Sequence, residues 1–161
     1  IVLVLAEQRR WSEIPAACGR AEAIDPGSVA GKSEVYRAWA RQRGNLAPAA
    51  VGTPLGAHRY APDLAKTLRL EVALAAGGDP AALLAEVDGE RAAATETGFL
   101  LLSLRGELLD RLGRREEARI AAREALAEAE RLAGSEILAR AFLADLRERV
   151  ARLELAGSPR G

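Results

Sequence analysis

The sequence predicts an all-α protein in which antiparallel helix hairpins stack into an α-solenoid. Residues 98–132 contain two helix-like segments separated by a glycine, and similar turns recur along the chain. Hydrophobic residues make up 49% of the chain, but aromatic residues only 4%, and runs of β-branched residues are few. An aliphatic, alanine-rich core of this kind suits closely packed helices better than a sheet.

The hairpin at residues 98–132 is the clearest unit. Its first helix, to about Leu112, has leucines at three- and four-residue spacing, which lie on one helical face. Gly113 is suited to end it, because glycine readily adopts the left-handed conformation of a helix stop. In the second helix, from about Arg115 to Leu132, small side chains share a face and allow close helix approach. The two sets are Leu101, Leu104, Leu108 and Leu112, then Ala118, Ala122, Ala125, Ala129 and Leu132.

A repeat near 34 residues connects this hairpin with the rest of the chain. Four turn positions are each followed, five residues later, by a small or apolar residue, and the intervals between these residues are 35, 34 and 35 (49 − 14, 83 − 49, 118 − 83). The pairs are Arg9 with Ile14, Gly44 with Ala49, Gly78 with Leu83, and Gly113 with Ala118. Two helices in such a period are typical of the tetratricopeptide repeat (TPR). The alternative is an irregular helical bundle whose glycines fall near this spacing.

The residues also resemble the TPR family, and similar tracts occur in large bacterial regulatory proteins. The matching positions are Trp11, Ala21, Pro26, Gly106, Ala118 and Ala125, whereas Gly56 and Glu90 depart from the family pattern. The resemblance implies a right-handed superhelix over residues 1–156, with about four units and a C-terminal capping helix. The units would lie near 1–26, 28–61, 62–97 and 98–132, the terminal helix at 135–155, and a flexible tail at 157–161.

In chain order, residues 1–8 are expected to end a first-type helix. Ser12 is a candidate N-cap for a helix over 12–24, with Pro15 in its first turn. Asp25-Pro26-Gly27 should break the chain, and Ser28 should cap a helix that reaches Arg43.

Residues 45–61 contain prolines and glycines that disfavour a helix, so a broken helix or loop is expected there. Pro62 should begin a helix to Ala76 whose apolar face contains Leu64, Leu68, Val72 and Ala75. Asp79-Pro80 is a strong start signal for a helix to about Glu96. The last helix should cover 136–155.

Composition limits the possible partners. The 23 basic and 23 acidic residues cancel, which makes a nucleic-acid surface unlikely, since binding to phosphates needs a basic excess. The opening Ile-Val-Leu-Val-Leu is too short to span a membrane and lacks a charged leader. A single cysteine, Cys18, fits a reducing, cytoplasmic compartment. Methionine is absent and the chain opens within an apolar run, so we expect a larger parent protein whose further domains could pack against this segment.

No residue pattern predicts an enzyme, a cofactor or a metal site. Residues 27–33 resemble a phosphate-binding loop, but three residues instead of four separate Gly27 and Gly31. His58 and Cys18 are the only residues of their types and do not supply a metal-ligand cluster or a supported dyad. Tyr36 and Trp39 are interpreted as core or groove-wall residues, with a ligand-stacking platform as the alternative.

By resemblance to the TPR family, the first-type helices line a concave groove that holds peptide segments of partner proteins. The period places Glu34, Arg41, Ser103, Glu107 and Asp110 on this face, with Ala38 between the first two. Their mixed charge departs from the lysine–asparagine clamp of chaperone-binding members. The first hypothesis is therefore a protein-interaction scaffold that binds a peptide segment or a neighbouring domain. The second is a sensor or regulatory arm of a bacterial transcriptional regulator or signalling kinase.

Overall fold

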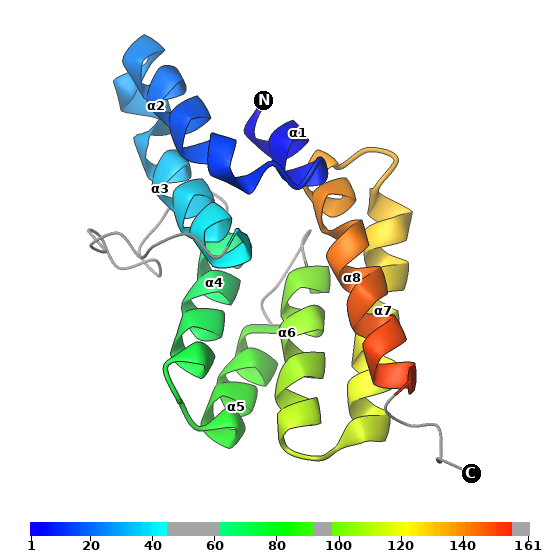
Figure 1. Cartoon of the computed structure of the whole chain (residues 1–161). Helices are drawn as coiled ribbons and strands as arrows, with labels where there is room; N and C mark the ends of the chain where they lie inside the picture. The colour runs from blue at the N-terminus through cyan, green and yellow to red at the C-terminus, as the bar shows by residue number, and fades with distance from the viewer. Residues whose placement is uncertain (45–61, 92–97, 156–161) are drawn as a thin grey trace. The chain divides into compact units, whose positions relative to one another are not determined.

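The computed structural model describes residues 1–44, 62–91 and 98–155, and for 26–32, 62–63 and 90–91 it describes the backbone alone. This part of the chain is helical and contains no strand (Figure 1). The all-α prediction is confirmed. The elements are α1 (Val2–Glu7), the 3-10 helix η1 (Trp11–Glu13), α2 (Ile14–Ile24), α3 (Pro26–Arg43), α4 (Pro62–Ala75), α5 (Pro80–Arg91), α6 (Gly98–Arg111), α7 (Arg115–Leu132) and α8 (Ile137–Leu155).

The chain divides into two compact units. Unit 1 comprises Ile1–Arg69 and unit 2 comprises Leu70–Gly161, so the boundary falls within α4. The predicted irregular segment at 45–61 and the predicted end of the fifth helix near Glu96 lie outside the described residues.

Two helix starts follow the sequence prediction and two do not. The carboxylate of Asp79 accepts hydrogen bonds from the amides of Ala81 (3.1 Å) and Ala82 (3.3 Å), which satisfies two of the free N–H groups at the start of α5. Pro62 begins α4 as expected. Ser12, however, lies inside η1 and does not cap α2, whose N-cap is Glu13 without a side-chain bond.

The second wrong prediction concerns the break before α3. The helix begins at Pro26, two residues before the predicted cap Ser28, so Asp25 alone separates α2 from α3. Proline is compatible with a first helical position, since its missing N–H would have no partner there. The three-residue break predicted from Asp25-Pro26-Gly27 is therefore reduced to one residue.

Three helices end with the same turn. After α1, α4 and α6, the amide of a residue with positive φ donates a hydrogen bond to the carbonyl oxygen three residues earlier. The amide of the next residue donates to the carbonyl oxygen five residues before it. The residues with positive φ are Arg9 (58°), Gly77 (87°) and Gly113 (75°). The bonds are Arg9 to Ala6 and Arg10 to Leu5, Gly77 to Leu74 and Gly78 to Ala73, and Gly113 to Asp110 and Arg114 to Leu109.

This recurrence corrects the register of the repeat by one residue. The structural equivalent of Gly113 is Gly77, 36 residues earlier (113 − 77), and not the neighbouring Gly78. The turn between α4 and α5 is one residue longer than that between α6 and α7, because Asp79 is added as the N-cap.

One large aromatic side chain lies in the core of unit 1, among mainly aliphatic residues. Trp39 of α3 is fully buried, and its ring packs edge-on against Trp11 with centroids 5.2 Å apart. Tyr36 lies 6.5 Å from Trp39 and is half-buried. The interpretation of Trp39 as a core residue is confirmed.

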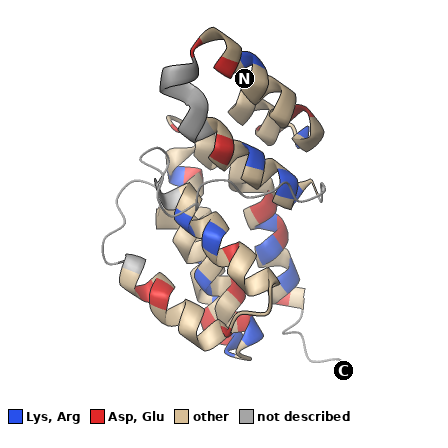
Figure 2. Ribbon diagram, turned by 90° about the vertical axis from the view of Figure 1, so that its left-hand side faces the viewer, with Lys and Arg blue, Asp and Glu red and all other residues tan. Residues whose placement is uncertain are grey.

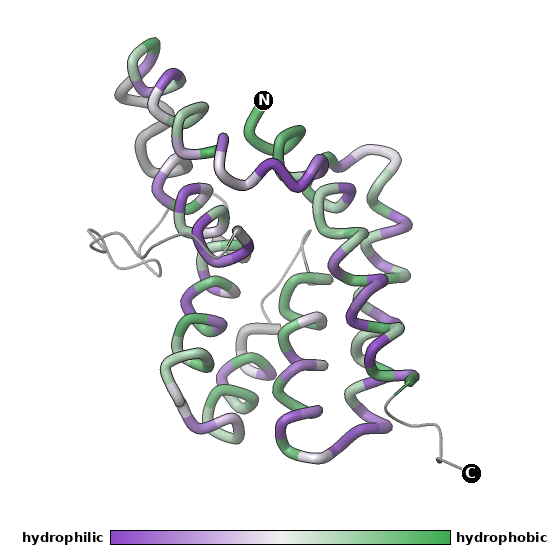
Figure 3. The backbone as a smooth tube through the Cα atoms, viewed as in Figure 1, coloured by the Kyte–Doolittle hydropathy of each residue, from purple (hydrophilic) through white to green (hydrophobic). Residues whose placement is uncertain are grey.

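The core of unit 2 is built mainly from leucine and alanine of α4–α8. Hydrophobic and hydrophilic residues alternate along these helices (Figure 3), as expected where one helix face is buried. Val72, predicted to be in the core, is 50% exposed, and Ala75 is also exposed. The main buried cluster consists of Leu70, Leu74, Leu83, Leu84, Val87, Leu101, Leu104, Leu108, Leu109, Ala118, Ala121, Ala122 and Leu153.

Gly106 determines how closely α6 and α7 approach. A Cβ atom at this position would lie 3.2 Å from the backbone oxygen of Ala118 and 3.5 Å from the amide nitrogen of Ala122. Ala118 and Ala122 are themselves fully buried. The small side chains predicted for this hairpin therefore lie where the two helix backbones come closest.

Candidate functional site

Three of the five predicted groove residues lie on α6. Ser103, Glu107 and Asp110 are spaced four and three residues apart and share one face of that helix. All three are half-buried. Two of them contact α8, which approaches α6 although more than 40 residues of sequence separate the contacting side chains.

Arg149 of α8 binds Ser103. One guanidinium nitrogen donates to both the backbone oxygen and the hydroxyl oxygen of Ser103, each at 2.6 Å. The side chain of Arg149 is only 15% exposed. This arginine therefore fixes the position of α8 against the middle of α6.

Glu107 is the centre of a cluster of three arginines. Its carboxylate lies 2.8 Å from Arg152 and 3.7 Å from Arg149, both on α8, and 3.4 Å from Arg111 on its own helix. The Glu107 side chain is 19% exposed. We call Ser103, Glu107, Arg111, Arg149 and Arg152 the α6–α8 polar cluster.

The arginines keep Glu107 ionised. Burial alone would raise the pKa of this carboxyl, but Arg149, Arg152 and Arg111 outweigh that effect and hold the pKa below its usual range. Arg111 and Arg152 are about half exposed, so the cluster has a basic, solvent-facing rim over a shielded carboxylate.

The other two predicted groove residues belong to α3 in unit 1. Glu34 is exposed and Arg41 is half-buried. Between them, Arg37 forms two hydrogen bonds of 2.6 and 2.7 Å to Glu22 of α2, which join the two helices. The structure thus brings Ser103 and Glu107 together through Arg149, and it places Glu34 and Arg41 on a separate unit.

Charged residues of both signs are interspersed along the helices (Figure 2). Many exposed arginines form pairs with acids three residues away, such as Arg114 with Glu117 and Arg131 with Glu128. Exposed pairs of this kind contribute little stability, but they balance the surface charge locally.

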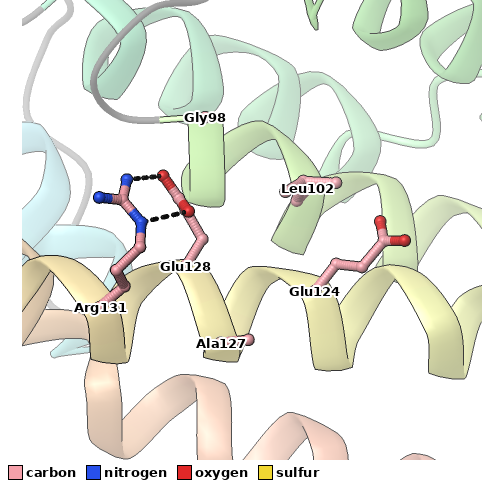
Figure 4. A pocket seen from close by; sticks show the side chains of 6 residues that line it. All are labelled: Gly98, Leu102, Glu124, Ala127, Glu128 and Arg131. Atoms are coloured by element: carbon pink, nitrogen blue, oxygen red, sulfur yellow. Dashed lines mark hydrogen bonds and ion pairs between the residues drawn. The ribbon is translucent and has the colours of Figure 1, made fainter.

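A hollow lies at the edge of the α6–α7 contact. Gly98 and Leu102 of α6 and four residues of α7 surround this hollow of about 460 Å³ that is open to solvent (Figure 4). The α7 residues are Glu124, Ala127, Glu128 and Arg131. Sequence reasoning missed this hollow because Leu102 lies beside the predicted leucine stripe, and no local pattern marks a gap between two helices.

The weaker chemical motifs have structural explanations where the structure describes them. Residues 27–33 lie within helix α3 and form no phosphate-binding loop. Cys18 is buried, and burial raises the pKa of its thiol despite the nearby Arg37 and a hydrogen bond with Ser33. His58 lies outside the described residues. Within the described ranges, no three histidine, cysteine or acidic side chains are grouped so as to hold a metal ion.

None of the described helices combines the length and the apolar character needed to cross a bilayer. Comparison with protein-family models, with curated proteins and with solved structures finds no match for this chain.

Proposed function

We propose that this chain is a TPR-like helical repeat domain that acts as a protein-interaction scaffold in the cytoplasm. The observation that carries the proposal is the common turn after α1, α4 and α6, at Arg9, Gly77 and Gly113. Arg9 and Gly77 are 68 residues apart (77 − 9), which is twice a 34-residue period, and Gly77 and Gly113 differ by 36. This turn is a common helix ending, so the support comes from its recurrence at intervals near 34 residues.

The helix contacts of unit 2 support the same proposal. α6 packs against α7 within one hairpin, and α8 contacts both α7 and α6. In stacked hairpins, each unit packs against the next one. In this arrangement α8 is the first-type helix that follows the 98–132 unit, and it caps the right-handed stack.

Each unit contributes first-type helices to the proposed binding surfaces, α3 in unit 1 and α6 in unit 2. Stacked hairpins of this type expose a concave surface on which a peptide segment or a neighbouring domain can lie. Glu34, Arg41 and Asp110 are the proposed contact residues there. Ser103 and Glu107 contribute indirectly, since they hold α8 in place and leave the basic groups of Arg111 and Arg152 at the rim.

The experiment is an affinity capture from a bacterial lysate, with the parent chain beside a triple variant. Glu34→Ala, Arg41→Ala and Asp110→Ala remove two acids and one base from the proposed surfaces and leave Glu107 and its arginines intact. The matched control changes Arg20, Glu86 and Glu116 to alanine. It removes the same charges from the exposed surface of the second-type helices α2, α5 and α7.

Proteins bound by the parent and by the control, but lost by the triple variant, would support the scaffold. Equal capture by all three chains would contradict the proposed surfaces. Capture of nothing by the parent would favour the second hypothesis, in which the domain is the regulatory arm of a larger protein and packs against other parts of that protein.

A further inference from the structure

The hollow between α6 and α7 combines an apolar wall with carboxylates. Leu102 and Gly98 of α6 and Ala127 of α7 provide apolar atoms on its sides, while Glu124 and Glu128 stand one helical turn apart on α7 (Figure 4). None of these residues belongs to the α6–α8 polar cluster. The hollow is therefore separate from the binding surfaces proposed above.

The two carboxylates differ in their partners. Glu128 is engaged by Arg131 through two hydrogen bonds, of 2.6 and 3.0 Å, at one end of the hollow. Glu124 is exposed, and within the part of the chain that the structure describes it makes no hydrogen bond or ion pair. The hollow therefore contains one negative charge that is not balanced by a neighbouring side chain.

One exposed apolar side chain, Ile120, lies on α7 outside the hollow. Ile120 lies one helical turn before Glu124 and is 48% exposed. Because Leu102 is half-buried, its exposed atoms form a shallow wall rather than an enclosed cavity. An occupant that covers this surface gains most if it brings an aliphatic side chain to Leu102 and Ala127 and a cation to Glu124.

We propose that this hollow is a docking site for a peptide segment in which an aliphatic residue neighbours a lysine or arginine. The aliphatic side chain lies against Leu102 and Ala127, and the basic side chain pairs with Glu124. An acidic segment would meet the carboxylate of Glu124 and is disfavoured by charge repulsion. This proposal goes beyond the scaffold function and does not depend on the proposed binding surfaces of α3 and α6.

The test is a nuclear magnetic resonance titration of the 15N-labelled chain with two peptides that differ only in charge. The probes are acetylated and amidated Gly-Leu-Lys-Leu-Lys-Gly and Gly-Leu-Glu-Leu-Glu-Gly. The lysine peptide is expected to shift the amide signals of Gly98, Leu102, Glu124 and Ala127, and the glutamate peptide to shift none of them at the same concentration.

Two variants make the assignment specific. Glu124→Gln keeps the shape of the side chain and removes its charge, and it should weaken binding of the lysine peptide about two- to fivefold, as expected for an exposed ion pair. Glu130→Gln removes a charge from the same helix outside the hollow, where Glu130 pairs with Arg147, and should leave the affinity unchanged.

The proposal is overturned if the lysine peptide shifts no signal up to millimolar concentration, or if its shifts lie outside the hollow. Equal binding of the two peptides, or equal affinity for the parent and Glu124→Gln, would also overturn it. The amide spectrum of each variant without peptide shows whether it is folded like the parent, so loss of structure is not mistaken for loss of binding.

Discussion

Both units contain an edge-on aromatic contact, Trp39 with Trp11 in unit 1 and Phe99 with Phe142 in unit 2, but the α6–α7 contact of unit 2 is made through small residues. In unit 1 the indole of Trp39 is fully buried and touches the ring of Trp11. In unit 2 the α6–α7 contact is made by Gly106 against Ala118 and Ala122. A large side chain keeps helices apart and fills the space between them, while small residues let the backbones approach. Trp39 and Gly106 therefore represent two different ways of packing helices against each other.

The units also differ in how their polar groups connect the helices. In unit 1, α2 and α3 are joined by the pair of Arg37 and Glu22. In unit 2, the single carboxylate of Glu107 forms ion pairs with three arginines from two helices. The loss of a single side chain should therefore have different consequences in the two units, and four sets of substitutions can measure this difference.

The largest effect is expected from Trp39→Ala in unit 1. Removing a buried tryptophan leaves a cavity and should lower the free energy of unfolding by about 3–5 kcal/mol. Chemical denaturation followed by circular dichroism measures this loss. Trp11→Ala is the matched control, since Trp11 is only half-buried and its removal should cost less. An equal loss in the two variants would show that Trp39 has no special place in the core.

The second effect concerns Gly106 in unit 2. Gly106→Leu inserts a side chain where a single added carbon would already lie 3.2 Å from backbone, and it should destabilise the chain by about 1–3 kcal/mol. Gly89→Leu is the control, because a Cβ atom at Gly89 in α5 has no neighbour within 4 Å. There leucine should stabilise the helix by up to about 1 kcal/mol, since glycine is a poor helix former. Two variants that melt alike would contradict the close α6–α7 contact.

The third effect is the pH dependence of Glu107. Because the folded state lowers the pKa of this carboxyl below 4.5, its ionisation favours folding above about pH 4.5, and this contribution is lost as the pH falls through the folded-state pKa. Glu107→Gln should lower the free energy of unfolding by about 1–3 kcal/mol near neutral pH, and the gap to the parent should shrink in acid.

Glu116→Gln provides the comparison for this measurement. Glu116 pairs with Arg119 but is 69% exposed, so its substitution should have an effect below about 1 kcal/mol. Denaturation curves at several pH values would distinguish the two sites. If the difference in free energy of unfolding between the parent and Glu107→Gln stays constant from neutral pH to pH 3, the charge of Glu107 does not cause the stabilisation.

The smallest effects are expected at the shared helix-ending turn. Gly113→Ala places a side chain at positive φ and should cost about 1 kcal/mol. Arg9→Gly removes a side chain from the same conformation and should stabilise unit 1 by less than about 1 kcal/mol. Thermal unfolding should give a melting temperature below that of the parent for Gly113→Ala and above it for Arg9→Gly. Changes of the same sign would mean that the two turns are not equivalent.

Local signals explain which helix boundaries could be predicted. Asp79-Pro80 and Gly113 act through neighbouring backbone groups, so their roles follow from a few residues of sequence. Ser12 and Ser28 carry the same type of signal. Ser12, however, lies within η1, where Trp11 packs against Trp39, and α3 begins before Ser28, at Pro26. Gly77 and Gly78 are adjacent, and only the hydrogen bonds show which of them is in the left-handed conformation.

The long-range contacts had no comparable signal. A stripe through Leu64, Leu68 and Val72 fits helical spacing, yet α4 exposes Val72 and buries Leu70 and Leu74, because the helix has neighbours on more than one side. Ser103 and Glu107 were predicted to lie on the groove face of α6, and both contact Arg149. That this contact comes from α8 depends on how distant helices pack, and no local spacing predicts it.

Amide hydrogen exchange of three chains tests the contrast between the two cores most directly. The parent, Trp39→Ala and Gly106→Leu would be compared residue by residue under native conditions. The account predicts that Trp39→Ala accelerates exchange mainly in α2 and α3, and that Gly106→Leu does so mainly in α6, α7 and α8. If both substitutions accelerate exchange equally in all of these helices, the two units share one cooperative core and the contrast drawn between them is wrong.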